Sequence, residues 1–516
     1  YHMTTYVLGL DGADWSLLRP WIADGHLPAF EQLLEEGISG DLESTLPPVT
    51  FPAWKCYSTG KTPGILGVYE WFRYDRETHE ISPNDAGSFR SREYWDVLTD
   101  DERTTGVVNM PTTHPASAGD SPFVIAGSPA SERKAFTKPE SLKRELREAI
   151  PDYRVKPDLV LSEATADELV AEAKTLFGQR FDAATWLAET KDCDLVHTTL
   201  FFTDTIQHRL WDRPEKIRAA YERVDELLGD LLERDDADTV VLMSDYGFTE
   251  IDEIFLINHW LLNRGDLVVS ESETRDVLST VGLTEDRLKQ FVGRLGLVNL
   301  AQALVPESIQ RAFPSESGRV AIQDVDIDWS ETKAVSLGRG PIYVNDAAFD
   351  DSTAKAAYID ELTDALTTLE TPAGDPVAAE IHDPAERYTG ELQSAPDLVV
   401  EYTTGVDTPE SIGGEVFGET TEWLATHRPT GIFAAWGDRI ATGTANLSLY
   451  DLAPTLLHYL DSPVPKDMDG DVRFDTLTGP AVDRDVTVGA PTATAHDGTQ
   501  ADRDVEDTLR ELGYLE

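Results

Sequence analysis

A set of side chains able to bind a metal ion or take part in a displacement reaction is spread along this chain: Asp11, Thr50, Asp204, His208, Asp245 and His427. Carboxylates and imidazoles are the ligands that zinc and similar divalent ions prefer in proteins. A threonine hydroxyl is a poor nucleophile by itself, but a metal ion can hold it as the alkoxide. The combination therefore predicts metal-assisted chemistry at the Thr50 oxygen.

The spacing of Asp204 and His208 puts both side chains on one face of a predicted helix, where a single ion can bridge them. Further ligands must then come from elsewhere in the fold. An ordinary i,i+4 polar pair on a solvated helix fits the same spacing. His427 precedes a predicted strand, and taken alone it fits an exposed loop histidine equally well.

Asp11 and Asp245 each follow a short apolar segment, so each is either a helix cap or a ligand. Asp14 is predicted to be the N-cap of a helix that begins near Trp15. Thr50 also fits an N-cap, with Pro52 in the first turn of the helix. In that position the free backbone N–H groups and the helix dipole would face a phosphate attacked by the Thr50 oxygen.

The elements that must position these residues are short apolar segments alternating with helical patterns: 5–10, 107–109, 123–126, 194–202, 239–243 and 431–436. Strands alternating with helices predict an α/β fold with a mostly parallel sheet and helices on both faces. Ligands of such sheets collect beyond the carboxyl ends of the strands, where the aspartates fall.

The predicted domain organisation is a catalytic core interrupted by one insertion. We expect the first part of the core over residues 3–262 and a helical cap over 263–325, with its main helical pattern at 284–313. The second part of the core follows over 326–473. Residues 474–516 form a tail that ends in a short amphipathic helix at 505–512.

Composition excludes some partners. Lys+Arg is 43 and Asp+Glu is 95, for a formal net charge of −52, which disfavours nucleic acid and anionic membranes. An acid excess spread along the whole chain is typical of a halophilic protein surface. The two cysteines, Cys56 and Cys193, are predicted to be buried thiols. With neither a signal-like leader nor a membrane-spanning apolar run, we expect a cytoplasmic protein.

The order of these motifs resembles the alkaline phosphatase superfamily, and within it the type I phosphodiesterase/nucleotide pyrophosphatase family. The matching segments are 9–12, 50–52 with 59–63, 204–208, 244–247 and His427. The resemblance implies an alkaline phosphatase-like fold with an inserted cap. It also implies a phosphoesterase that acts on a small-molecule phosphate ester through a covalent phospho-threonine intermediate on Thr50.

The resemblance implies two divalent ions as well. Asp204, His208 and His427 would hold one zinc-like ion, and Asp11, Asp245 and the Thr50 oxygen would hold the second. A phosphodiester is expected in preference to a monoester, because the first basic residue after Thr50 is Lys55 and the other candidate cation, Arg339, is distant in sequence.

The chain departs from the family pattern at two places. Tyr246 stands where the second-site aspartate is usually followed by histidine, so an oxygen-lined second site holding Zn²⁺, Mn²⁺ or Mg²⁺ is expected unless His114 or His259 substitutes. Residues 65–68 read Ile-Leu-Gly-Val where members often have His-Gly-Ile. The asparagine that contacts substrate in nucleotide pyrophosphatases has no evident counterpart, which argues against nucleotide substrates.

Three other functions fit parts of the pattern. A sulfatase would need Cys or Ser at position 50 and arginine four residues later, where the chain has Thr50 and Trp54. A phosphomonoesterase would need a fixed cation beside the phosphate. A non-catalytic or single-metal protein that binds a phosphorylated ligand is the alternative from another class, and Tyr246 and Leu66 are the residues that favour it.

Overall fold

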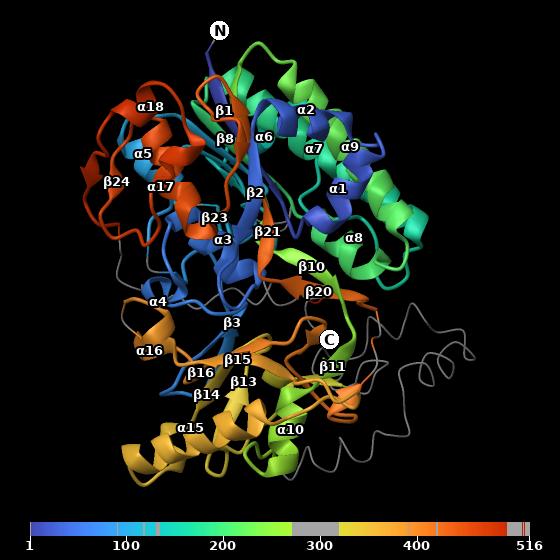
Figure 1. Cartoon of the computed structure of the whole chain (residues 1–516), viewed down its shortest axis with the longest axis vertical. Coiled ribbons are helices and arrows are strands. Elements are labelled where there is room, and N and C mark those ends of the chain that lie inside the picture. Colours follow the sequence, from blue (N-terminus) through green and yellow to red (C-terminus); the bar gives the residue numbers. More distant parts are fainter. Residues whose placement is uncertain are drawn as a thin grey trace.

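The computed structural model describes residues 2–89, 91–116, 119–130, 135–270, 319–390, 392–418, 420, 422–492, 508 and 510. Its centre is a ten-stranded sheet with the strand order β22-β2-β21-β9-β1-β8-β5-β6-β7 and with β23 paired to β2 (Figure 1). These strands are β1 (Thr4–Leu10), β2 (Ile38–Glu43), β5 (Thr105–Val108), β6 (Phe123–Ile125), β7 (Thr137–Lys138), β8 (Leu195–Leu200), β9 (Ala237–Met243), β21 (Thr430–Gly437), β22 (Gly443–Thr444) and β23 (Leu447–Ser448).

The five central strands β9, β1, β8, β5 and β6 run parallel, and β21 joins them antiparallel to β9. Every residue of β1 is buried, because parallel neighbours lie on both sides and helices cover both faces. This burial explains why the strand reads as an apolar run without polar alternation. The predicted α/β fold with a mostly parallel sheet is confirmed.

Helices cover the two faces of the sheet as separate groups (Figure 1). One group contains α3 (Thr50–Thr59), α5 (Tyr94–Asp100) and α17 (Leu452–Tyr459). The other contains α1 (Trp15–Ala23), α2 (Pro28–Glu36), α7 (Ala166–Lys191), α8 (Phe202–Leu210) and α9 (Pro214–Leu232). Further helices are α6 (Leu142–Ala149) and the single turns α4 (Pro63–Leu66), α16 (Pro384–Arg387) and α18 (Pro480–Asp483).

A second, four-stranded antiparallel sheet lies below the central sheet in Figure 1, with the order β13-β14-β16-β15. Its strands are β13 (Ala334–Ser336), β14 (Pro341–Val344), β15 (Ala378–His382) and β16 (Leu398–Tyr402), accompanied by α10 (Ile257–Arg264) and α15 (Ser352–Thr367). Its inward side chains belong to the same hydrophobic core as those of the central sheet. The two sheets are therefore parts of one packed body.

Small sheets of two or three strands complete the described chain. The pair that matters for the site is β10 (Gly247–Glu250) with β20 (Ala425–Arg428), which is antiparallel and lies between the two sheets in Figure 1. Two other pairs are antiparallel, β3 (Phe72–Tyr74) with β4 (Ile81–Pro83) and β12 (Val320–Ala321) with β18 (Ser411–Ile412). In a three-stranded sheet, β11 (Glu253–Phe255) pairs in parallel with β17 (Val406–Asp407) and antiparallel with β19 (Phe417–Gly418), while β24 (Val464–Pro465) and β25 (Val488–Gly489) pair in parallel.

The remaining predictions about the fold concern the insertion, the tail and the two cysteines. The predicted helical pattern at 284–313 and nearly all of the predicted helix at 505–512 lie outside the described residues. Cys56 and Cys193 are buried free thiols, as expected. Within the described part of the chain, we find no helix with the length and apolar character needed to cross a membrane.

Candidate functional site

Thr50 begins helix α3 as its first helical residue, not as its cap. The N-cap is Val49, whose extended backbone (φ −120°, ψ 140°) precedes the helix. The prediction that the Thr50 side chain caps the helix is therefore wrong by one residue. Its hydroxyl lies 2.7 Å from the Tyr246 hydroxyl oxygen. The side chain is completely buried.

Asp204 and His208 project from α8, and His427 reaches them from β20. The Asp204 Oδ1 atom lies 3.2 Å from His208 Nε2 and 3.3 Å from His427 Nε2. The two Nε2 atoms are 3.1 Å apart. In a tetrahedral zinc site with bonds of about 2.0 Å, neighbouring ligand atoms are about 3.3 Å apart. The three atoms are therefore spaced like one face of a zinc coordination tetrahedron.

The orientation of both rings also suits metal binding. His208 Nδ1 lies 2.6 Å from the Ala425 carbonyl oxygen, and His427 Nδ1 lies 2.9 Å from that of Pro48. Each Nδ1–H donates to its carbonyl, which leaves the Nε2 lone pair directed at Asp204. Two lone pairs and a carboxylate oxygen that converge in a buried place need a cation between them. This donor set fits zinc.

Burial sets the charge states of this group. It lowers the pKa of His427 to about 4, so the ring is neutral at pH 7 and able to bind a metal. Burial by itself would raise the pKa of Asp204, but the neighbouring His208 and His427 hold it well below its usual range. With the Asp204 and His208 side chains each only 1% exposed, the alternative of a solvated surface pair is excluded.

Aromatic rings hold the two histidines in place. Trp423 stacks on His208 with ring centroids 3.6 Å apart, and Tyr246 stacks on His427 at 3.7 Å. The β10–β20 pairing puts Phe248 opposite His427 and so brings the residues after β9 beside this histidine. His427 is therefore a strand residue with a buried side chain, and the interpretation as an exposed loop histidine is wrong.

Asp11 and Thr50 lie next to this group, around the hydroxyl of Tyr246. That hydroxyl is 3.0 Å from Asp11 Oδ1 and 3.1 Å from Asp204 Oδ1, in addition to its contact with Thr50. Asp11 Oδ2 accepts from the indole N–H of Trp54 at 3.0 Å. The predicted residues are thus brought together, with Tyr246 in the middle.

Asp245 accepts the backbone N–H of Gly12 at 3.1 Å. Its second carboxylate oxygen is buried without a hydrogen-bond donor among the described residues. The strand β10 follows it, so Asp245 has no helix to cap and that alternative is wrong. Burial raises the pKa of both Asp11 and Asp245 well above the usual range, and their mutual proximity adds to the shift in Asp11.

Asp14 does cap α1, accepting from Ser16 N at 2.7 Å, and it also binds Arg428. His114 and His259, the possible substitutes for the missing histidine, belong to none of the metal-competent groups found among the described residues. Trp54, Tyr246 and Trp423 are site residues whose contacts sequence reasoning did not predict. For Trp54 a signal existed, since it lies one helical turn after Thr50.

Arg339 comes closer to the site than its sequence position suggested. It lies in the turn 338–340 between β13 and β14, and a Cβ on Gly340 would lie 3.3 Å from the side chain of Pro47. The Arg339 Nε donates to Asp407 Oδ1 at 2.8 Å, and the guanidinium lies 5.2 Å from the Trp423 ring centroid. Because Trp423 stacks on His208, the Arg339 guanidinium of the second sheet, paired with Asp407, lies near the His208 ring.

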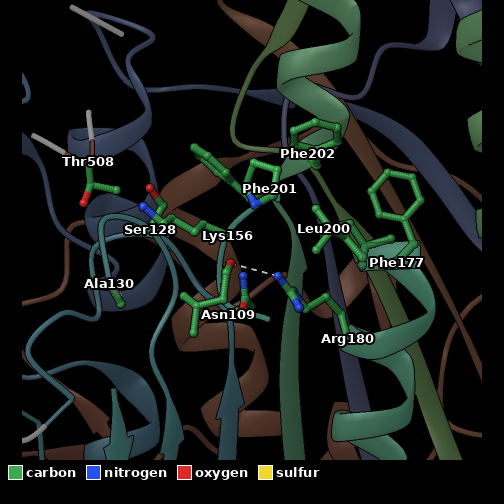
Figure 2. A pocket seen from close by; sticks show the side chains of 13 residues that line it. Asn109, Ser128, Ala130, Lys156, Phe177, Arg180, Leu200, Phe201, Phe202 and Thr508 are labelled. Atoms are coloured by element: carbon green, nitrogen blue, oxygen red, sulfur yellow. Dashed lines mark hydrogen bonds between the residues drawn. The ribbon is translucent and has the colours of Figure 1, made fainter. Parts of the chain in front are cut away.

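A separate open cavity lies beyond the carboxyl ends of β5, β6 and β8 (Figure 2). Its polar lining includes Asn109, Ser128, Lys156 and Arg180. The Arg180 guanidinium there donates to the backbone oxygen of Val155 at 2.9 Å. None of the residues predicted for the site lines this cavity.

Comparison with solved structures finds the same fold in three kinds of hydrolase. Phosphonoacetate hydrolase from Sinorhizobium meliloti 1021, in complex with phosphonoacetate, matches with 14% identity and a TM-score of 0.54 over 88% of this chain and 94% of the other. Murine ectonucleotide pyrophosphatase/phosphodiesterase 5 matches with 12% identity and a TM-score of 0.52 over 92% and 100%. Wild-type alkaline phosphatase PafA matches with 12% identity and a TM-score of 0.55 over 92% and 99%.

A search among curated proteins found no match. The model of one protein family, described as type I phosphodiesterase / nucleotide pyrophosphatase, matches residues 5–427. This span runs from β1 to His427 and so includes every residue predicted for the site. The chain belongs to the type I phosphodiesterase / nucleotide pyrophosphatase family.

Proposed function

We propose that this protein hydrolyses small-molecule phosphodiesters in a metal-dependent reaction, with the Thr50 oxygen as nucleophile. Family membership supports phosphoester hydrolysis in general. The observation that carries the finer proposal is the position of the Thr50 hydroxyl. It lies 2.7 Å from the Tyr246 hydroxyl, which in turn contacts Asp204 of the zinc-like ligand group.

In the first step the Thr50 oxygen attacks phosphorus, a new O–P bond forms and the bond to the leaving alkoxide breaks. Thr50 gives up one proton and the alkoxide takes one up, so that an alcohol leaves. The hydrogen-bond arrangement supports this role. Asp204, whose pKa lies below its usual range, is ionised and only accepts, so the single phenol proton of Tyr246 goes to Asp204 and the Thr50 hydroxyl donates to Tyr246. The Thr50 proton is thus directed at the Tyr246 oxygen.

In the second step water attacks the phospho-threonine, a phosphomonoester leaves, and the Thr50 oxygen takes back a proton. A divalent ion held by Asp204, His208 and His427 would supply charge stabilisation for the phosphoryl oxygens. One comparison supports the nucleophile. The murine ectonucleotide pyrophosphatase/phosphodiesterase 5 is described as inactive in a threonine-to-alanine variant bound to AMP.

The charges near the site favour a diester over a monoester. A monoester dianion needs a cation that is free to pair with its second charge. Arg339 is the cation that the fold carries to this region, and Asp407, only 5% exposed, already neutralises it at 2.8 Å. Glu410 lies against the same turn, within 3.4 Å of a Cβ placed on Gly338. A singly charged diester fits this balance better.

The test is hydrolysis of an aryl phosphodiester, an aryl phosphate monoester and an aryl sulfate with Zn²⁺ or Mn²⁺, at low salt and in molar KCl. Thr50→Ala should abolish diester turnover, and Thr50→Ser should retain a measurable part of it. Thr59→Ala is the matched control, because Thr59 is also a buried hydroxyl of α3 but donates to the Lys55 carbonyl of its own helix. Diester turnover that survives Thr50→Ala would remove Thr50 from the mechanism.

A non-catalytic phospholigand-binding protein is the second candidate, and one observation favours it. Both Thr50 and Tyr246 are fully buried, so no solvent reaches the Thr50 oxygen in this structure. Calorimetric titration with inorganic phosphate and with a non-hydrolysable diester separates the two functions. Binding without turnover of any ester, at verified metal content, would support the binder.

A further inference from the structure

The hydroxyl of Tyr246 lies where the resemblance to the family would put an ion. Two of the oxygens around it, those of Thr50 and Asp11, are predicted ligands of the second ion, and they lie 2.7 and 3.0 Å away. The third belongs to Asp204, at 3.1 Å, which is a ligand of the first predicted ion. These are hydrogen-bond lengths, whereas a divalent ion would approach such oxygens to about 2.0–2.2 Å.

The ligand atoms of the two predicted ions are arranged differently. Those of Asp204, His208 and His427 all lie within 4.8 Å of one another. Among the described residues, the Thr50 hydroxyl has its hydrogen bond to Tyr246, so the phenol stands between Thr50 and Asp11. The ligand atoms of the first set thus surround one point, whereas two members of the second set, Thr50 and Asp11, both contact the phenol oxygen of Tyr246.

The Tyr246 ring is held firmly where it stands. It is fully buried and stacks on His427 at an interplanar angle of 17°. The following residue, Gly247, has no room for a side chain, since a Cβ there would lie 2.1 Å from the Thr430 carbonyl oxygen. The backbone on this side of Tyr246 is therefore packed against β21, which opposes any displacement of the ring by an incoming ion.

We propose that the protein uses one tightly held divalent ion, at Asp204, His208 and His427, and that the Tyr246 hydroxyl positions Thr50 in place of a second ion. Tyr246 is thus a positioning residue, which receives the Thr50 hydrogen bond and passes its own to a carboxylate. This inference rests on the proposed role of Thr50 as nucleophile. In this proposal the hydrogen bond to Tyr246 orients the Thr50 hydroxyl, a role that a second ion would otherwise have.

Metal content tests the proposal without depending on turnover. Wild-type protein dialysed against micromolar Zn²⁺ should contain one zinc per chain by plasma mass spectrometry, and Asp204→Asn should contain none. Tyr246→His should contain two zinc ions per chain, because an imidazole next to Asp245 replaces the phenol with a metal ligand. Two tightly bound ions in the wild type, or one in Tyr246→His with its fold intact by circular dichroism, would overturn the proposal.

Kinetics test the positioning role. Tyr246→Phe keeps the ring and its stacking but removes the hydroxyl, so kcat should fall about 100-fold with little change in KM, the scale expected for a misplaced reacting group. Tyr57→Phe is the matched control, since Tyr57 is a fully buried phenol of α3 bonded to Tyr94 and His197. An unchanged kcat in Tyr246→Phe, with Thr50→Ala inactive, would refute the positioning role and leave the proposed function standing.

Discussion

Protonation of His427 in the metal-free protein should cost folding free energy. Burial lowers the pKa of the ring to about 4, against an ordinary value of 6.5, and the side chain is only 1% exposed. Between these two pH values the unfolded chain binds a proton that the native ring does not. Stability rises with pH wherever the unfolded state binds more protons, so this contribution is lost as the pH falls from 6.5 towards 4.

The size of the effect follows from the shift. A difference of 2.5 between 6.5 and about 4 corresponds to about 3 kcal/mol at about 1.36 kcal/mol per pKa unit. Asp11 and Asp245 act in the opposite direction, because burial raises their pKa and the native state then holds protons that the unfolded chain has released. The contribution of His427 must therefore be measured as a difference between two proteins.

The assay is urea unfolding of wild type and His427→Gln in EDTA, at pH 7 and pH 4.5. Glutamine does not titrate and can still donate to the Pro48 carbonyl. From pH 7 to pH 4.5 the wild type should lose about 2 kcal/mol more than the variant. The opposite sign would refute the reasoning, because it would mean that Asp204 holds His427 protonated as an ion pair and that the ring is not a neutral ligand.

Three further predictions concern single contacts around the site. Zinc at about 100 times its dissociation constant should stabilise the wild type by about 2.7 kcal/mol over EDTA, and His208→Ala should remove this gain in thermal melts. Trp54→Phe leaves Asp11 Oδ2 without its indole donor and should cost about 1–3 kcal/mol in urea unfolding, whereas an unchanged midpoint would mean that this contact is not formed. Arg339→Met leaves the buried Asp407 carboxylate without its cation and should lower the free energy of unfolding by about 3 kcal/mol. The double variant Arg339→Met/Asp407→Asn should recover most of this loss. Equal losses in the single and double variants would argue against this ion pair.

The fold and the identity of most site residues could be predicted from local pattern. Strand β1 is apolar throughout because both of its neighbours are parallel strands, and the aspartate that ends it falls at the ligand-binding edge of the sheet. Asp204 and His208 share one helix, so their proximity depends only on helical spacing. The errors concern local context. Thr50 is one residue inside its helix, and His427 lies in strand β20, which the local sequence pattern did not predict.

What only the tertiary structure decided is how distant segments meet. His427 reaches His208, 219 residues away in sequence, through the pairing of β20 with β10. Sequence alone determined that a tyrosine stands where the family usually has histidine, but not where its hydroxyl lies. That hydroxyl reaches Thr50 across 196 residues, because the order and register of the strands bring the end of β9 beside the start of α3. Strand order and register depend on long-range packing, and short-range periodicity does not record them.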